Sequence, residues 1–338
     1  MRGKSNIQRI YSADLCPLLS NLTQFRRAER KRSLKIVMIC GIVDLGSNTI
    51  RLSIYQCEPQ GSRLLMNRKV MAGLAGYVEH GILSAQGIQV ACQVLQEYHA
   101  LMENFGFHDL HVFATASLRN ISNTQQAVDQ IQAATGLTVD VLSGEEEAAL
   151  SFEGAVGAGP ESGLLIDLGG ASTELVQYQG HQILSSCSLS FGSLSLFSRY
   201  VSGLHPTSKE RRAIREQVRK QLSRHISSPP TIPHACGVGG TARATCKVVN
   251  LFYGNPQDNR LLSTSQLRTL CKRLKEPSQA DLRLLLKSVP DRIHTLIPGM
   301  LALDTIAHAF QVEDITISPW GVREGYLRSK VWKETTML

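Results

Sequence analysis

Short apolar runs alternate with longer amphipathic segments along most of the chain. Five of these runs are bounded by glycines or polar turn residues, a pattern typical of β-strands. The runs are Ile42–Asp44, Leu52–Tyr55, Val112–Ala114, Leu164–Asp167 and Leu175–Tyr178. Because the first two and the last two are each separated by a short glycine-containing segment, the pattern also predicts strand–turn–strand units.

Two longer segments have helical periodicity. The first extends from Ser84 to Met102, and its apolar residues Ile88, Leu95 and Met102 share one helix face. The mixture of such helices with the predicted strands indicates an α/β protein.

The second helix is expected to begin near Thr207, because Thr207 and Glu210 match a capping box. Ile214, Val218 and Leu222 would form its buried stripe, since they recur every four residues. Its other positions include six basic residues, which predict a solvated face or, as the alternative, a guide for a polyanionic substrate. These are Arg211, Arg212, Arg215, Arg219, Lys220 and Arg224.

One local pattern occurs twice. Each copy has an apolar run, an aspartate, a glycine two residues later and a charged residue seven positions after the aspartate. The first copy extends from Asp44 to Arg51 and the second from Asp167 to Glu174. Each glycine would let the backbone approach a ligand, and exposed N–H groups there can bind phosphate oxygens. Two such hairpins facing each other would form a phosphate clamp.

A third glycine-rich segment, Gly237-Val-Gly-Gly-Thr241, precedes a predicted helix. Its backbone amides would therefore face an anion at a helix N-terminus. The sequence contains neither the G-x-x-x-x-G-K-[ST] P-loop nor the G-x-G-x-x-G dinucleotide fingerprint. The glycines therefore indicate phosphate binding of another kind.

Composition and charge narrow the choice of partners. The 338 residues suggest about two domains, and 43% hydrophobic with 19% charged residues indicates a globular chain rather than a disordered one. The net charge is +8, but nine basic and two acidic side chains lie within residues 1–37. The rest of the chain is nearly neutral, so we do not expect a nucleic-acid partner.

Cysteine usage and hydropathy indicate a cytoplasmic protein. The eight cysteines are dispersed, with no C-x-x-C pair, and are expected to be reduced and buried. The longest apolar run, Ile36 to Val43, is too short for a membrane span, and no small-residue signal cleavage site follows it. We therefore expect a buried first strand there and no membrane partner. His108 and His111 alone have a ligand-like spacing, without a neighbouring motif that would favour a metal site.

The motifs together resemble one known family. In order along the chain, six blocks resemble the exopolyphosphatase/guanosine pentaphosphate phosphohydrolase (Ppx/GppA) family, within the actin-like fold. The blocks are Asp44-Leu-Gly-Ser-Asn-Thr-Ile-Arg51, Ala114-Thr-Ala-Ser-Leu-Arg119, Ser143-Gly-Glu-Glu-Glu-Ala148, Asp167-Leu-Gly-Gly-Ala-Ser-Thr-Glu174, Gly237-Val-Gly-Gly-Thr241 and Ser318-Pro-Trp-Gly-Val-Arg-Glu-Gly325. One departure is Ala171, where the family usually has a third glycine.

The resemblance implies two actin-like (ribonuclease H-like) domains that flank an interdomain cleft. Domain I would comprise residues 38–157 and be completed by 318–338, and domain II would comprise 158–317, with a hinge at 157–160. Residues 1–37 would be a basic extension, either a mobile tail or the product of a misassigned start. The chain resembles the short, two-domain form of the family, and the family suggests a homodimer.

The resemblance also implies an activity. The phosphate chain of polyphosphate or guanosine pentaphosphate would lie in the cleft, and water would remove a terminal phosphate with Mg²⁺. The sequence does not choose between the two substrates. The short form and the basic helix after Thr207 lean slightly toward polyphosphate.

The acidic cluster supplies three candidates for the general base. Ser143 and Glu146 match a capping box, so Glu146 is expected at the helix start. Glu145 and Glu147 lie about 200° apart around a helix, so they cannot both face the cleft. Glu147 fits the family position of the catalytic glutamate, with Glu146 as the second choice. Helix-dipole stabilisation is the alternative explanation of the cluster.

Other residues take roles from the same resemblance. Asp167 and Glu174 would hold Mg²⁺ and orient the water. Arg323 and Glu324 are expected to close the domain interface. The expected phosphate-binding residues are Asp44, Gly46, Ser47, Asn48, Arg51, Gly169, Gly170, Ser172, Gly239, Gly240, Thr241, Arg119 and Arg292. For Arg119, a structural ion pair is the alternative.

Two other functions remain in competition. An ATP-dependent kinase of the same fold would share the paired phosphate loops, but it would need an adenosine pocket. A non-catalytic sensor of polyphosphate or of an alarmone would need cations more than the carboxylates Glu147, Asp167 and Glu174. Turnover measured beside binding would separate the sensor from the hydrolase.

Overall fold

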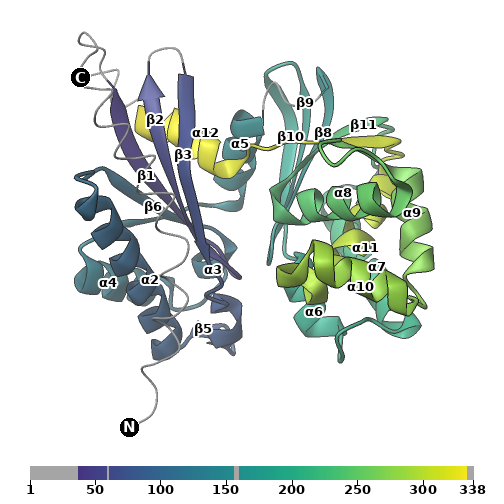
Figure 1. Ribbon diagram of the computed structural model, residues 1–338, viewed down its shortest axis with the longest axis horizontal. Coiled ribbons are helices and arrows are strands. Elements are labelled where there is room, and N and C mark those ends of the chain that lie inside the picture. The colour runs from purple at the N-terminus through teal and green to yellow at the C-terminus, as the bar shows by residue number, and fades with distance from the viewer. Residues whose placement is uncertain (1–36, 59–60, 156–159, 333–338) are drawn as a thin grey trace.

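The chain folds into two α/β halves that lie side by side (Figure 1). The computed structural model describes residues 37–58, 61–155 and 160–332. Residues 1–36 of the basic extension and 157–159 of the expected hinge lie outside the described residues. The predicted α/β class is confirmed, because each half combines a sheet with helices.

The first half contains a five-stranded sheet of order β3-β2-β1-β6-β7. Strands β1 to β3 form an antiparallel meander, whereas β6 and β7 continue the sheet parallel to β1. The strands are β1 (Met38–Leu45), β2 (Ile50–Glu58), β3 (Gly61–Val70), β6 (Leu110–Ala114) and β7 (Val139–Val141), with a separate hairpin of β4 (Val78–Glu79) and β5 (Ile82–Leu83). The helices are η1 (Leu74–Tyr77), α2 (Ala85–Asn104), α3 (Ala116–Arg119), α4 (Thr124–Thr135) and α5 (Gly144–Ala155).

The second half repeats this plan with a six-stranded sheet of order β10-β9-β8-β11-β13-β12. The strands are β8 (Ser162–Leu168), β9 (Thr173–Gln179), β10 (Gln182–Leu189), β11 (His234–Val238), β12 (Leu261–Ser263) and β13 (Asp314–Ile317). Its helices are α6 (Ser193–Tyr200), α7 (Ser208–His225), α8 (Gly239–Tyr253), α9 (Thr264–Arg273), α10 (Gln279–Ser288), η2 (Pro290–Arg292) and α11 (Ile293–Ala309). In both halves, a central strand therefore pairs antiparallel with the next strand and parallel with a later one.

The five predicted strands and both predicted helices are present. Helix α2 begins after Ser84, whose side chain accepts a hydrogen bond from the Gly87 N–H, and α7 begins with the predicted Thr207–Glu210 capping box. One expectation for α7 was wrong, because Arg211 is not on the solvated face. It is buried and donates to the backbone carbonyl oxygens of Cys271 and Leu274.

The C-terminal segment returns from the second half to the first, where α12 (Val322–Tyr326) and the π-helical turn η3 (Leu327–Trp332) pack beside α5 (Figure 1). Tyr326 and Leu327 enter the apolar cluster around Ile42 and Phe113. On its other side, α5 contacts the second sheet through Phe152. Helix α5 therefore packs against elements of both halves, and of its three glutamates only Glu147 is buried.

None of the helices among the described residues is long and apolar enough to cross a membrane.

Glycines allow α5 and α12 to pack this closely. A Cβ atom on Gly154 would lie 1.9 Å from the Gly321 carbonyl oxygen, and one on Gly325 would lie 1.8 Å from the Leu150 carbonyl oxygen. Both contacts are with backbone, so an added methyl group would force the helices apart.

We therefore expect Gly325→Ala to lower the free energy of unfolding by about 1–3 kcal/mol, which is typical of overpacking. Urea denaturation followed by circular dichroism measures this change. Gly203→Ala is the matched control, because a Cβ there would have no atom within 4 Å. Equal midpoints for the two variants would show that the two helices do not depend on this close approach.

Candidate active site

The two repeated hairpins meet at a cleft between the halves. Their strands pair in the same register, with Asp44 opposite Arg51 in the first and Asp167 opposite Glu174 in the second. The turns also match, because the N–H of the glycine at each turn donates to a carbonyl oxygen three residues later. The distances are 3.1 Å from Gly46 N to Thr49 O and 3.0 Å from Gly169 N to Ser172 O.

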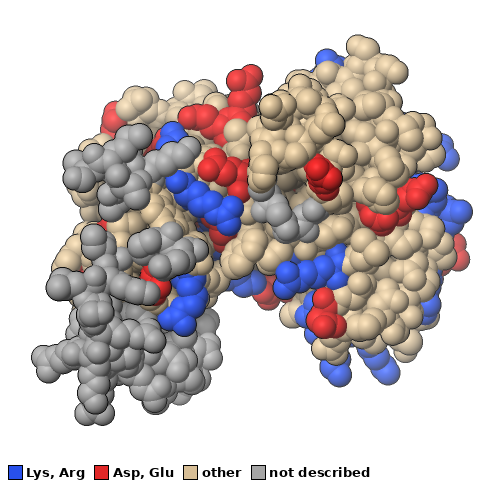
Figure 2. All heavy atoms as spheres, turned by 90° about the horizontal axis from the view of Figure 1, so that it is seen from above, with Lys and Arg blue, Asp and Glu red and all other residues tan. Residues whose placement is uncertain are grey.

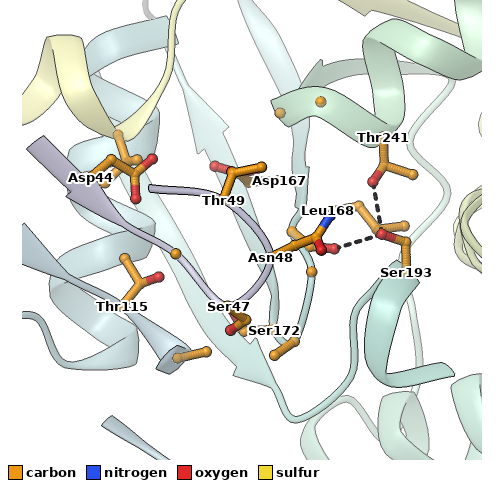
Figure 3. Close-up of a pocket in the computed structure, with 18 of the residues that line it drawn as sticks. Asp44, Ser47, Asn48, Thr49, Thr115, Asp167, Leu168, Ser172, Ser193 and Thr241 are labelled. Atoms are coloured by element: carbon orange, nitrogen blue, oxygen red, sulfur yellow. Dashed lines mark hydrogen bonds between the residues drawn. The ribbon is translucent and has the colours of Figure 1, made fainter. Parts of the chain in front are cut away.

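The turns approach each other closely (Figure 3). A Cβ on Gly170 would lie 3.9 Å from the Cβ atoms of Ser47 and Asn48 in the opposite hairpin. Between the hairpins lies a cavity of about 150 Å³ that both of them line. The expectation that the repeats face each other is thus confirmed.

The N-terminus of α8 lies over the same cavity, as the third glycine segment predicted. Gly239 has a φ of 89°, in the left-handed region that favours glycine, and a Cβ there would lie 2.8 Å from Asp167 Oδ1. The Gly240 position is equally tight, since a Cβ would lie 2.2 Å from Arg292 Nη2. Thr241 donates to Ser193 Oγ, which in turn donates to the Gly169 carbonyl oxygen, so α8 is tied to the second turn.

Four arginines converge on this cavity from both halves: Arg51, Arg243, Arg292 and Arg323. Among the described residues, arginine–carboxylate ion pairs are made by other arginines and not by these four. Burial, then repulsion from Arg323 and Arg51, lowers the pKa of Arg243 to about 10. An anion in the cavity would relieve this repulsion, because guanidinium groups bind phosphate oxygens in pairs.

Glu147 is the acidic residue that α5 directs into the cavity. Its side chain is 9% exposed and its carboxylate accepts a hydrogen bond from Arg119 Nη1 at 2.7 Å. Burial raises the pKa of Glu147 to about 7, although Arg119 opposes this increase. A carboxylate with such a pKa can accept and release a proton near neutral pH.

The other two glutamates of the cluster lie outside the cavity. Glu145 and Glu146 are exposed, and Glu146 forms the predicted capping box with Ser143. Neither residue lines the cavity. The preference for Glu147 over Glu146 as the candidate base therefore agrees with the geometry.

Asp167 and Glu174 both lie near Glu147, but only Asp167 reaches the cavity. Asp167 lines the cavity and accepts a hydrogen bond from Ser151, whereas Glu174 is fully buried behind the lining. Glu174 Oε1 accepts from Ser188 at 2.9 Å and lies 3.7 Å from Arg119 Nη2, while its Oε2 has no hydrogen-bond partner. Burial, together with the nearby charges of Glu147 and Asp167, raises the pKa of Glu174 well above its usual value.

The residues at the site suit only one mode of magnesium binding. No group of three or more His, Cys, Asp or Glu side chains within the described ranges is arranged to hold a metal by itself. Mg²⁺, however, commonly uses one or two carboxylates and takes its other ligands from substrate phosphates and water. Asp167 at the cavity wall suits that mode, and the unpartnered oxygen of Glu174 lies in the layer behind it.

The structure brings most of the expected phosphate-binding residues to the cavity. Those that line it are Asp44, Gly46, Ser47, Asn48, Arg51, Gly169, Gly170, Ser172, Gly239, Gly240, Thr241 and Arg292. Arg119 does not line it but pairs with Glu147 and Glu174, the ionic role that was considered for it.

Sequence reasoning missed other lining residues. Arg243, Thr115 and Ser193 were not singled out, and Arg323 was expected only at the interface between domains. Thr115 and Arg323 fall within quoted motif blocks, and Arg243 comes two residues after Thr241. A search for basic residues one helical turn beyond the glycine segment would have found Arg243.

Two α/β halves of related topology, joined at a cleft made of paired hairpins and lined by arginines, define a two-domain protein of the actin-like class. The chain belongs to the Ppx/GppA phosphatase family, whose model matches residues 53–334.

Solved structures of similar proteins agree with this assignment. The Aquifex aeolicus member of the Ppx/GppA family is 25% identical with a TM-score of 0.72, and the match covers 88% of this chain and 99% of that chain. An exopolyphosphatase-like protein is 21% identical with a TM-score of 0.77, covering 89% and 100%. An exopolyphosphatase from Cytophaga hutchinsonii is 20% identical with a TM-score of 0.75, covering 86% and 97%. The expected actin-like fold is confirmed.

The raised pKa of Glu147 has a consequence for stability. The folded state holds this proton more tightly than the unfolded chain, so the contribution is present at acid pH and is lost as pH rises from about 4.5 to about 7. We expect the free energy of unfolding of Glu147→Gln, relative to the natural protein, to rise by up to about 3 kcal/mol between pH 5 and pH 8. Urea denaturation at both pH values measures it. With Glu145→Gln, on the exposed side of α5, the difference should stay constant; a constant difference for Glu147→Gln as well would contradict the assigned pKa.

Proposed function

We propose that this protein is a Mg²⁺-dependent phosphohydrolase that releases the terminal phosphate of inorganic polyphosphate, guanosine pentaphosphate or both. Membership of a phosphatase family supports hydrolysis of phosphoanhydrides in general. The observation that carries the finer proposal is the position of Glu147. This buried carboxylate has a pKa of about 7 and lines the same small cavity as four arginines that form no ion pair with a carboxylate among the described residues.

In the proposed reaction, the substrate's terminal phosphate lies between the two hairpin turns and the N-terminus of α8. Backbone N–H groups of the turns and the guanidinium groups of Arg51 and Arg292 bind its oxygens. A water molecule attacks the terminal phosphorus as the bond to the bridging oxygen breaks, and Glu147 accepts the proton of the water. Inorganic phosphate and the shortened chain are the products, and the bridging oxygen leaves with the negative charge.

Arg119 positions the base. Its guanidinium contacts Glu147 at 2.7 Å and Glu174 at 3.7 Å, so it holds the Glu147 carboxylate in one orientation. Because burial outweighs Arg119 in its effect on the pKa of Glu147, the residue remains basic enough to accept a proton.

We propose that Asp167 holds Mg²⁺ at the cavity wall, with Glu174 as the second carboxylate behind it. When bound, the ion would add positive charge against the phosphate oxygens and offset the repulsion among the buried carboxylates.

A cytoplasmic location remains part of the proposal. All seven cysteines among the described residues are free, and six of them are buried, which suits a reducing compartment.

Glu147→Gln should lower the rate of phosphate release by about 10²–10⁴-fold, because a general base contributes that much. In the natural protein, the rate should rise with pH through about 7, as Glu147 loses its proton. Phosphate release from both substrates, followed from pH 5.5 to pH 8.5, measures both effects. Glu145→Gln, two residues away and exposed, serves as the control and should retain the rate. Near-normal turnover in Glu147→Gln would remove Glu147 from the role of base.

Arg51→Ala should raise the KM for the phosphate chain by about 10–100-fold, the equivalent of one or two hydrogen bonds to a charged group. Arg51→Lys should fall in between, because an ammonium keeps the charge but not the paired donors. Steady-state kinetics on tripolyphosphate provides the values. Arg63→Ala, an exposed position on β3 outside the cavity, is the matched control. An unchanged KM for Arg51→Ala would place Arg51 outside the substrate site.

A further inference from the structure

The four arginines of the cleft reach it from both halves. Arg51 on β2 and Arg323 on α12 come from the first half, whereas Arg243 on α8 and Arg292 on η2 come from the second. At the surface as well, Lys and Arg side chains lie on both sides of the boundary between the halves (Figure 2). Because like charges repel one another, a guanidinium stays in the cleft only where some contact holds it there.

Arg323 is the arginine whose charge acts most on the others. After burial itself, repulsion from Arg323 is the main reason why the pKa values of Arg51 and Arg243 are lowered. Arg323 forms no ion pair with a carboxylate among the described residues. Repulsion alone would therefore turn its side chain away from the cleft.

Ser53 provides the contact that opposes this repulsion. Arg323 Nη1 donates a hydrogen bond of 2.7 Å to Ser53 Oγ. Ser53 lies on β2 and is 0% exposed, and Arg323 is 9% exposed. Because both groups are removed from water, this charge-assisted hydrogen bond is stronger than one at the surface.

Tyr55 fixes the helix that carries Arg323. Its hydroxyl donates to Glu324 Oε1 at 2.5 Å, and Glu324 Oε2 accepts a hydrogen bond of 2.8 Å from the Gly321 N–H. Burial, and then the charge of Glu324, raises the pKa of Tyr55, so the hydroxyl keeps the proton that it donates. The first turn of α12 is thus tied to β2.

Both contacts come from one face of β2. Alternate residues of a strand project to the same side, so Arg51, Ser53 and Tyr55 share a face. Arg51 lines the cleft, whereas Ser53 and Tyr55 contact α12. Strand β2 therefore places one arginine of the cleft directly and a second one through α12.

We propose that Ser53 and Tyr55 are positioning residues that hold Arg323 in the cleft, where its guanidinium binds the phosphate chain of the substrate. Ser53 acts on the guanidinium directly, and Tyr55 acts through Glu324 and the first turn of α12. Neither Ser53 nor Tyr55 lines the cavity. The inference rests on the proposed function for the identity of the anion.

Calorimetric titration with tripolyphosphate tests the proposal through binding rather than turnover. The full-length Glu147→Gln protein is the reference, at one concentration of Mg²⁺. Ser53→Ala and Tyr55→Phe, each added to this reference, should weaken binding by about 2–10-fold, the equivalent of one hydrogen bond. Tyr178→Phe is the matched control and should leave the affinity unchanged. It also removes the hydroxyl of a buried ring, but that hydroxyl donates to the Pro160 carbonyl oxygen in the second half.

A second series in the Arg323→Met background separates positioning from a general effect on the fold. If Ser53 and Tyr55 act through Arg323, Ser53→Ala and Tyr55→Phe should weaken binding no further in this background. Residues that only stabilise the fold would weaken binding by the same factor in both backgrounds, and that result would overturn the proposal. An unchanged affinity in Arg323→Met, or in both hydroxyl variants, would overturn it too.

Phosphate release by the natural protein distinguishes this inference from the proposed function. Binding that depends on Arg323 and on both hydroxyl groups, without any release of phosphate, would refute the hydrolysis and leave the positioning role standing. Normal release, with an affinity that neither hydroxyl affects, would refute the positioning role alone. A protein that binds no tripolyphosphate would overturn both.

Discussion

The burial of charge between two hairpins is the constraint on which the site depends. Acidic side chains and arginines line the same cavity, and burial shifts the pKa of Glu147 upward and that of Arg243 downward. Charged groups removed from water in this way cost free energy. The cost persists in the native protein because the surrounding contacts hold the groups in place: Ser151 on Asp167, Ser188 on Glu174 and Arg119 on Glu147.

The duplicated hairpin provides the frame for these charges. In each half, the second-last residue of the central strand is an aspartate, and its partner on the next strand carries a charge of its own. Because paired residues of antiparallel strands project to the same face, each hairpin directs two charged side chains together. The difference between the halves is chemical: the first partner is Arg51, which can bind phosphate, and the second is Glu174, which cannot.

Much of this arrangement could be predicted from the sequence, because the elements that form it depend on residues close together in the chain. The strands, the two turns and the Ser143–Glu146 capping box follow from patterns within about ten residues, whereas the choice of Glu147 over Glu145 rests on the resemblance to the family. Contacts between distant segments could not be read this way. Arg211 has the periodicity of a solvated position, yet it is buried because the carbonyl oxygens of α9 and the residue after it accept its hydrogen bonds. Arg243 and Arg323 reach the cleft only because α8 and α12 are brought there by the whole fold.

Glu174 shows that the spacing of a residue in the sequence does not decide whether its side chain reaches the cavity. By spacing it is the counterpart of Arg51, but it lies behind the cavity wall while Arg51 lines the cavity. Its charge is therefore felt mainly by its neighbours. Burial and the carboxylates of Glu147 and Asp167 raise the pKa of Glu174 well above its usual value. Glu147, in contrast, lines the cavity, and its pKa of about 7 gives it a proton affinity suited to accept a proton from water.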